Sequence, residues 1–316
     1  MKTIINSTMA ILLAAVLATG CIQETESDFD KIVQRDDALL EAHISSNNIE
    51  ATKTQLGYYY RKDVEVDEGS QFANNDIIGI YYEIRTIDGH LIDSYLDEDN
   101  NPIVYKYTQN GLWPSAVGFA SGLAKPGEEF TLYIPSYLAY NTYSYEQLIT
   151  SGANLIVKVK YVRKYTQDQV KQLEDQMIQA YIAENELEGF EKNDKDIYIR
   201  VVEEGEGEPS KNGNTITFSY EMFELEGTKA IAESTTNNAV ISLGSAQNME
   251  FLNQSLVNLP KGGEVEVIAP SHAAYGETVQ VIPNEIRQDL VKKGELQQFT
   301  PPYAPIRFNA EMIRIQ

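Results

Sequence analysis

The side chains that most often carry out catalysis are sparse in this chain. It has three histidines, His43, His90 and His272, and they lie too far apart for a typical metal-ligand pattern. The sequence contains no Gly-x-Ser-x-Gly nucleophile elbow, P-loop or dinucleotide fingerprint. Carboxylates are abundant, but with a net charge of −22 their pairing carries little information. If the protein is an enzyme, we expect it to act without metal, cofactor or covalent nucleophile.

The single cysteine, Cys21, follows a segment typical of exported proteins. The apolar run at residues 9–17 is too short to span a bilayer but suits a secretory signal. Ala18-Thr19-Gly20 before the cysteine resembles a bacterial lipobox, in which residues 1–20 are removed and Cys21 is acylated. The alternative is an ordinary signal peptide with an incidental cysteine.

These features predict an outer-membrane lipoprotein of a Gram-negative, Bacteroidetes-like envelope. The residue after the cysteine is Ile22, not the aspartate that often signals retention in the inner membrane. We therefore expect the protein to be anchored at the periplasmic face of the outer membrane. The acidic tether at residues 24–30 leaves the cell surface as an alternative. The charge of −22 disfavours nucleic acid and anionic lipid as partners. The lipid anchor, not the charge, must then hold the protein at a membrane.

The chain repeats itself at a spacing of 138 residues. The interval from Tyr82 to Gly89 recurs from Tyr220 to Gly227, and Pro135-Ser136 returns as Pro270-Ser271 with a slightly shorter spacing. Solenoid repeats have periods of about 20–50 residues, so this period indicates a duplicated domain.

Each copy reads as a lead-in helix followed by a β-rich domain. Ser27 with Asp30 and Thr166 with Gln169 form capping boxes, each followed by apolar residues at helical spacing. Residues 155–162 and 215–220 alternate apolar with polar side chains, which is typical of half-buried antiparallel strands. The expected units are a signal peptide (1–20), a tether and lead-in helix (21–50), a first domain (51–164), a linker helix (165–195) and a second domain (196–316).

The order of short motifs within each copy resembles the FKBP-type peptidyl-prolyl cis-trans isomerases. In the first copy the motifs are Tyr82, Asp88-Gly89, Asp93-Ser94, Gly118, Gly122-Leu123, Pro126-Gly127-Glu128, Ile134-Pro135, Ala139-Tyr140 and Asn154-Leu155-Ile156-Val157. The second copy adds Ala274-Tyr275-Gly276 and a closing strand at 301–313. The resemblance implies an α+β fold of two FKBP-like domains, each a twisted antiparallel sheet wrapped on a short helix, here near residues 113–123 and 249–257.

The resemblance also implies an apolar pocket in each domain. In the first domain Tyr82 and Tyr140 match the family's two pocket tyrosines, and Asp93 matches its buried aspartate. Phe119 falls where the floor is usually tryptophan, and Trp113 lies too early for that place. The remaining pocket positions are Ile92, Ala116 and Val157. The alternative is that Tyr82 and Tyr140 are ordinary core tyrosines whose hydroxyls reach the edge of the domain.

The second domain departs further from the family pattern. The pocket positions there are Tyr220, Leu252, Tyr275 and Phe308. Leu252 replaces the floor aromatic, and Glu233 is the residue that could substitute for the aspartate, although its longer side chain would need more room. A long loop at 277–300 is expected at the rim of this second pocket. We therefore expect the first domain to be the better catalyst, so that Tyr140→Ala or Asp93→Ala lowers activity several-fold and Tyr275→Ala hardly changes it.

Two functional hypotheses remain open. The first is a cofactor-free prolyl isomerase that folds exported proteins and whose clients are proline-containing polypeptides. The second is a non-catalytic lipoprotein that uses FKBP-like domains as docking surfaces in an envelope or secretion complex. Fewer pocket aromatics favour the second hypothesis, whereas retention of Tyr82, Asp93 and Tyr140 together favours the first.

Overall fold

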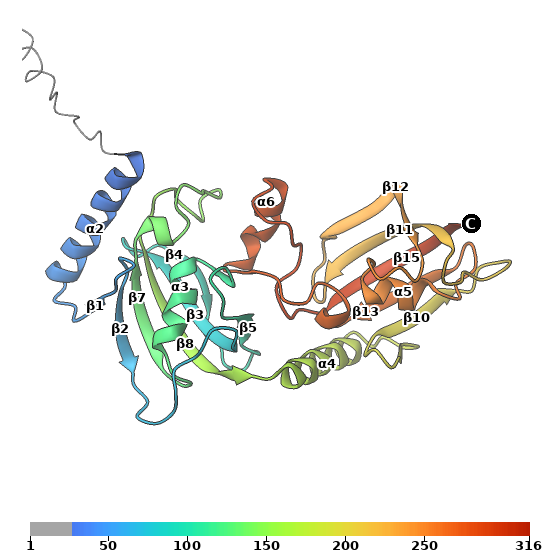
Figure 1. The fold of residues 1–316 in the computed structure, drawn as a ribbon, viewed down its shortest axis with the longest axis horizontal. Coiled ribbons are helices and arrows are strands. Elements are labelled where there is room, and N and C mark those ends of the chain that lie inside the picture. Colours follow the sequence, from blue (N-terminus) through green and yellow to red (C-terminus); the bar gives the residue numbers. More distant parts are fainter. Residues whose placement is uncertain (1–26) are drawn as a thin grey trace, which may run out of the picture.

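The computed structural model describes residues 27–316 and contains two antiparallel sheets, one in each half of the chain (Figure 1). The first sheet has seven strands: β1 (Thr52–Lys53), β2 (Tyr59–Val64), β3 (Ile77–Thr86), β4 (Leu91–Tyr95), β5 (Ile103–Lys106), β7 (Glu129–Ile134) and β8 (Leu155–Tyr165). The second has six: β9 (Glu191–Lys192), β10 (Tyr198–Glu203), β11 (Thr215–Glu224), β12 (Ala232–Ser242), β13 (Glu264–Ala269) and β15 (Ile306–Ile315). The predicted signal peptide and Cys21 lie outside the described residues.

The two sheets share one topology, which confirms the predicted duplication. The first runs β1-β2-β7-β8-β3-β4, with β5 also pairing with β3, and the second runs β9-β10-β13-β15-β11-β12 when read in the same direction. Each sheet packs on a short helix, α3 (Ser115–Ala120) or α5 (Glu250–Leu256). The predicted α+β class, with a twisted antiparallel sheet and one short helix per domain, is therefore confirmed.

Each domain is preceded by a long helix, as the capping boxes predict. These helices are α2 (Asp28–Ser46) and α4 (Gln167–Glu184), and both capping boxes are formed. Leu40 of α2 packs with Tyr59 and Tyr133 of the first sheet, whereas Ile178 of α4 packs with residues of the second sheet. In Figure 1, α4 also connects the two domains.

The lead-in helices dock through a repeated contact that was not predicted from the sequence. The backbone N–H of Ser136 donates to Asp36 Oδ2 at 2.9 Å, and that of Ser271 donates to Glu174 Oε2 at 3.0 Å. Each serine hydroxyl donates to the same carboxylate, and all four residues are buried. Asp36 and Glu174 have the spacing of the repeat, which is the signal that could have identified them. Asp36 also forms an ion pair with Arg35 at 2.6 Å.

We expect Glu174 to make the stability of the second domain depend on pH. Burial raises its pKa from 4.5 to about 7, despite hydrogen bonds from Ser271 that favour the ionised form. Because the unfolded chain ionises at lower pH, stability should be full below about pH 4.5. It should fall by about 3 kcal/mol as the pH rises through about 7. Urea unfolding at pH 4.5 and pH 8 should show this loss, and Glu174→Gln should remove it.

The matched control is Glu184→Gln, which changes an exposed carboxylate on the same helix. It should leave the pH dependence of unfolding as it is in the natural chain. A pH dependence that survives in Glu174→Gln would contradict the assignment to this carboxyl group.

The long loop at 277–300 forms structure of its own and lies beside the first domain. It contains β14 (Gln280–Val281), the 3-10 turn η4 (Asn284–Ile286) and α6 (Arg287–Lys292). β14 pairs in parallel with β6 (Leu112–Trp113) of the first domain. The peptide bonds Trp113–Pro114 and Ile282–Pro283 are cis. The remaining 3-10 turns are η1 (Ser121–Leu123), η2 (Ser136–Leu138) and η3 (Ser271–Ala273).

Candidate functional site

The predicted polar residues of the first domain come together on neighbouring elements. The Tyr82 hydroxyl, on β3, donates to Asp93 Oδ2, on β4, at 2.6 Å. Tyr82 is buried, but Asp93 is only half-buried, so the expectation of a buried aspartate is wrong. β4 ends the sheet and has a paired neighbour on one side only, which leaves the side chain partly open to solvent.

Tyr140 follows η2 and shares the electrostatic environment of that pair. Burial raises the pKa of Tyr82, and the Asp93 carboxylate raises it further. Burial likewise raises the pKa of Tyr140 well above its usual value, with a further contribution from Asp93. Both hydroxyls therefore keep their protons at neutral pH and act as hydrogen-bond donors.

The apolar positions predicted for this pocket belong to one core. Ile92 is buried on β4, Val157 on β8 and Ala116 on α3, and all three are in the hydrophobic cluster that contains Tyr82 and Tyr140. This cluster fills the space between the inner face of the sheet and α3.

The aromatic wall beside Tyr140 differs from the prediction. Phe119 is half-buried at the margin of α3, because Ala116, Val117 and Ala120 form the fully buried face of that short helix. Phe119 does not line the cavity next to Tyr140, whereas Trp113 does.

Trp113 takes this place because it lies on the extended segment that precedes α3. Its ring meets the Tyr140 ring edge-on, with centroids 4.9 Å apart, and the Tyr143 ring at 5.5 Å. Trp113 therefore lines this cavity, a role that was not predicted from the sequence. Tyr143 was also missed, although it lies three residues after Tyr140.

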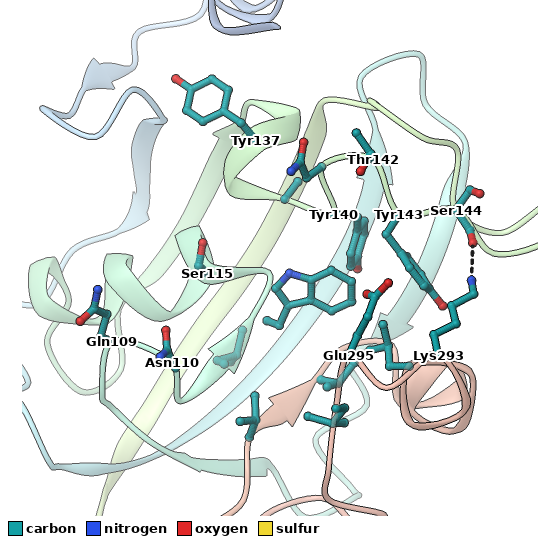
Figure 2. A pocket seen from close by; sticks show the side chains of 18 residues that line it. Gln109, Asn110, Ser115, Tyr137, Tyr140, Thr142, Tyr143, Ser144, Lys293 and Glu295 are labelled. Atoms are coloured by element: carbon teal, nitrogen blue, oxygen red, sulfur yellow. Dashed lines mark hydrogen bonds between the residues drawn. The ribbon is translucent and has the colours of Figure 1, made fainter. Parts of the chain in front are cut away.

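A cavity of about 660 Å³ lies between the first domain and the 277–300 segment. Trp113, Tyr140 and Tyr143 line it from the first domain, and Leu290 and Glu295 are among the residues that line it from the segment. Figure 2 shows Tyr140 and Tyr143 facing Lys293 and Glu295 across this space. The Lys293 ammonium lies 4.5 Å from the centre of the Tyr143 ring. The loop predicted at the rim of the second pocket thus borders the first one.

The second domain also brings its predicted pocket residues together. Tyr220 stacks on Phe308 with ring centroids 5.5 Å apart. Leu252 and Tyr275 are half-buried against the same core. Burial raises the pKa of Tyr275 to about 12, and its hydroxyl lies 3.7 Å from the sulfur of Met222.

Two features of the second pocket differ from the first. Phe251, next to Leu252 in α5, is buried and meets Phe308 edge-on at 5.1 Å, so it supplies the aromatic that Leu252 lacks. Glu233 is exposed on β12 opposite Glu221, so it does not take the place of Asp93. The hydroxyl of Tyr275 therefore faces a thioether, whereas its first-domain counterpart Tyr140 donates to the carbonyl oxygen of Ile282.

Among residues 27–316, no group of three or more His, Cys, Asp or Glu side chains could hold a metal ion. Over the same residues, no helix is both long and apolar enough to cross a bilayer.

The comparisons with known proteins agree with this architecture. Residues 206–313 match the family model of FKBP-type peptidyl-prolyl cis-trans isomerases. A stretch of 144 residues, 45% of this chain, is 30% identical to the probable FKBP-type peptidyl-prolyl cis-trans isomerase FkpA of Neisseria meningitidis serogroup B. That stretch spans 50% of the curated relative's length.

Solved structures give weaker similarities. The three FKBP domains of wheat FKBP73 match over 84% of this chain and 99% of theirs, with 17% identity and a TM-score of 0.32. FkpA from Escherichia coli matches over 49% of this chain and 75% of its own, with 18% identity and a TM-score of 0.35. The family match and the curated relative support the FKBP-type peptidyl-prolyl isomerase family, most directly for the second domain.

Proposed function

We propose that the protein is a peptidyl-prolyl cis-trans isomerase that assists the folding of exported proteins. One contact supports this most directly: the Tyr140 hydroxyl donates to the carbonyl oxygen of Ile282 at 2.7 Å, and the next residue is Pro283. The first-domain site thus binds the carbonyl group of an X-Pro bond in a buried, apolar setting. That carbonyl is the group whose electronic state changes during isomerisation.

The reaction needs no chemistry beyond such a site. Rotation about an X-Pro bond breaks amide resonance across a barrier of about 18–20 kcal/mol. The twisted transition state has a less polar carbonyl than the planar ground state, so an apolar aromatic pocket favours it. Acceleration of 10⁴–10⁶-fold requires about 5.5–8 kcal/mol of preferential binding. Tyr140 in one domain and Tyr275 in the other supply a neutral donor beside such an apolar wall.

The proposed setting is the periplasmic face of the outer membrane, where an acylated Cys21 anchors the chain. The clients are then proline-containing segments of newly exported proteins. The acidic surface disfavours nucleic acid as a partner. The matched stretch spans half of the curated relative, so the substrates and location of that relative are not transferred to this chain. The proposed substrates and location rest on features of this chain.

A second candidate function is that of a non-catalytic docking protein in an envelope or secretion complex. The observation that favours it is the buried packing of Ile282 and Leu290 against the first-domain core. A site that is filled by a segment of the same chain fits a role in holding the two domains together as well as it fits catalysis.

The test of the proposed function is acceleration of X-Pro isomerisation by the full chain, on a panel of X-Pro peptides and on a protein whose refolding is limited by proline. We expect acceleration of both. The double variant Tyr140→Phe/Tyr275→Phe, which removes only two hydroxyls, should lower it at least several-fold. Tyr181→Phe in α4 is the matched control and should act like the natural chain. If no X-Pro substrate is accelerated, the docking function replaces the isomerase.

A further inference from the structure

We infer that residues 279–290 are an intramolecular ligand of the first-domain pocket, and that an incoming polypeptide must displace them. The inference rests on the proposed function for the kind of ligand, a polypeptide segment with aliphatic residues before an X-Pro bond. It adds that the site is occupied by the chain itself, so that its activity is held down until the segment leaves.

The main chain of the segment binds as a peptide ligand would. The N–H of Gln280 donates to the Gly111 carbonyl at 2.9 Å, and the N–H of Ile282 donates to the Trp113 carbonyl at 3.0 Å. These bonds form the parallel pairing of β14 with β6. Pairing of an extended segment with a short free strand gives affinity without depending on side-chain identity.

The carbonyl group before the proline lies at the polar end of the pocket. Tyr140 is buried, and its hydroxyl donates to the Ile282 oxygen. The same hydroxyl lies within electrostatic reach of Asp93, which accepts a hydrogen bond from the Tyr82 hydroxyl. The segment therefore uses the residues that the sequence predicts for the recognition of a client.

Apolar side chains of the segment are buried in the core of a domain to which they do not belong. Val281 and Ile282 are 1% and 0% exposed, and both belong to the first-domain cluster. Ile286 and Leu290 extend this contact along η4 and α6. Burial of aliphatic side chains is the main source of affinity at such a site. A competing client therefore needs aliphatic residues at the two positions before its proline.

Polar contacts at the rim are more exposed and contribute less. The Tyr143 hydroxyl donates to Asp289 Oδ2 at 2.8 Å, and Lys106 forms an ion pair with Glu277 at 2.6 Å. Tyr143 is buried, whereas the other three side chains are partly or fully exposed to solvent. Solvent therefore largely screens the ion pair between Lys106 and Glu277. These contacts fix the position of the segment without making its release prohibitive.

The two ends of the segment lie close together in the second domain. The Thr278 hydroxyl donates to the Thr300 carbonyl at 2.8 Å, so the two ends of the insertion meet. Replacing residues 279–298 with Gly-Ser-Gly should therefore close the loop and open the first-domain pocket. Trp113, the single tryptophan of the chain, lies beside the vacated strand and reports on the opening by its fluorescence.

The test measures binding of a fluorescein-labelled synthetic peptide with the sequence of residues 279–286. We expect the excised chain to bind it about tenfold more tightly than the intact chain, or better, because the competing segment is gone. Trp113 emission should move to longer wavelength on excision and return when the peptide binds. Tyr140→Phe in the excised chain should weaken binding of the peptide.

A point variant guards against misfolding of the excised chain. Val281→Glu places a charge at a position that is buried in the first-domain core. The substitution should therefore release the segment within the full-length protein. It should reproduce the tighter peptide binding and the tryptophan shift. Val240→Glu is its matched control, because Val240 is 61% exposed on β12, and it should change neither.

The outcomes separate this inference from the proposed function. If excision increases peptide binding but no variant catalyses isomerisation, the self-occupied site stands and the isomerase is wrong. If the intact chain catalyses and neither folded variant binds the peptide more tightly, the isomerase stands and self-occupation is overturned. Tighter binding together with about tenfold faster isomerisation supports both.

Discussion

Replacing Arg287 with methionine is expected to free the 277–300 segment from the first domain while both sheets stay folded. We expect the backbone amides of Gln280 and Ile282 to exchange hydrogen about a hundredfold faster in Arg287→Met than in the natural chain. These two amides pair with the first domain, so their exchange measures the docked state directly.

The large effect follows from the position of Arg287 at the centre of the segment. The side chain is 0% exposed and donates to the carbonyl oxygens of Val279, at 2.7 Å, and Gln298, at 3.4 Å. It also donates to Asn284 Oδ1 at 3.1 Å, and Asn284 in turn donates to Glu224 of the second domain. Burial lowers the pKa of Arg287 to about 10, with Glu224 opposing the change, so the group remains charged at neutral pH.

Methionine fills much of the volume but leaves these buried acceptors without a donor. Each unsatisfied buried group costs about 1–3 kcal/mol. A loss of about 3 kcal/mol for the docked segment corresponds to the predicted hundredfold change in local opening. Arg314→Met, an exposed position on β15, is the control and should leave exchange of both amides unchanged. Unchanged amide exchange in Arg287→Met would show that docking of the segment does not depend on the hydrogen bonds of Arg287.

Replacing Cys21 with serine is expected to move the protein from the membrane fraction to the soluble fraction almost completely. Serine cannot carry the thioether-linked lipid that the lipobox-like Ala18-Thr19-Gly20 predicts. Stable membrane attachment takes two acyl chains, or one chain with a basic patch, because each buried methylene contributes about 0.8 kcal/mol.

Neither surface charge nor a membrane-spanning helix within residues 27–316 can take over the role of this anchor. A net charge of −22 opposes adsorption to anionic lipid, and no helix in that range has the length and apolarity of a membrane span. Fractionation of cells that express Cys21→Ser or the control Thr25→Ser, with detection of the protein by immunoblot, checks the prediction. Continued pelleting of the Cys21→Ser variant with membranes would contradict the acylated anchor.

Local sequence patterns predicted individual strands and helices of this protein, and the resemblance to the FKBP-type isomerases supplied their arrangement. Alternating side chains at 155–162 and 215–220 identify β8 and β11, because one face of each strand packs on a core. The capping boxes at Ser27 and Thr166 mark the starts of α2 and α4, because cap residues satisfy N–H groups within one helical turn. The repeat in the sequence then predicts that the two sheets share a topology.

The resemblance also predicted which polar groups would meet in the first domain. Tyr82 and Asp93 lie on neighbouring strands of one hairpin, so a short-range register brings them together. Half-burial of Asp93 was not predictable in this way, since it depends on β4 having no further strand beside it. Similarly, the contact of Trp113 with Tyr140 was not predictable, because it depends on where the extended segment before α3 runs in the folded domain.

Only the tertiary structure decided which pocket the 277–300 segment occupies. The sequence predicts an apolar stripe at Ile286 and Leu290. Such a stripe indicates that one face is buried, but it does not identify the surface against which that face packs. Tyr140 and Ile282 are brought together by the relative placement of two domains that α4 connects, a geometry that no local pattern encodes. The residues that each repeat contributes to its own pocket are thus set by the sequence of that repeat, whereas the residues of the 277–300 segment reach the first pocket through the packing of the two repeats.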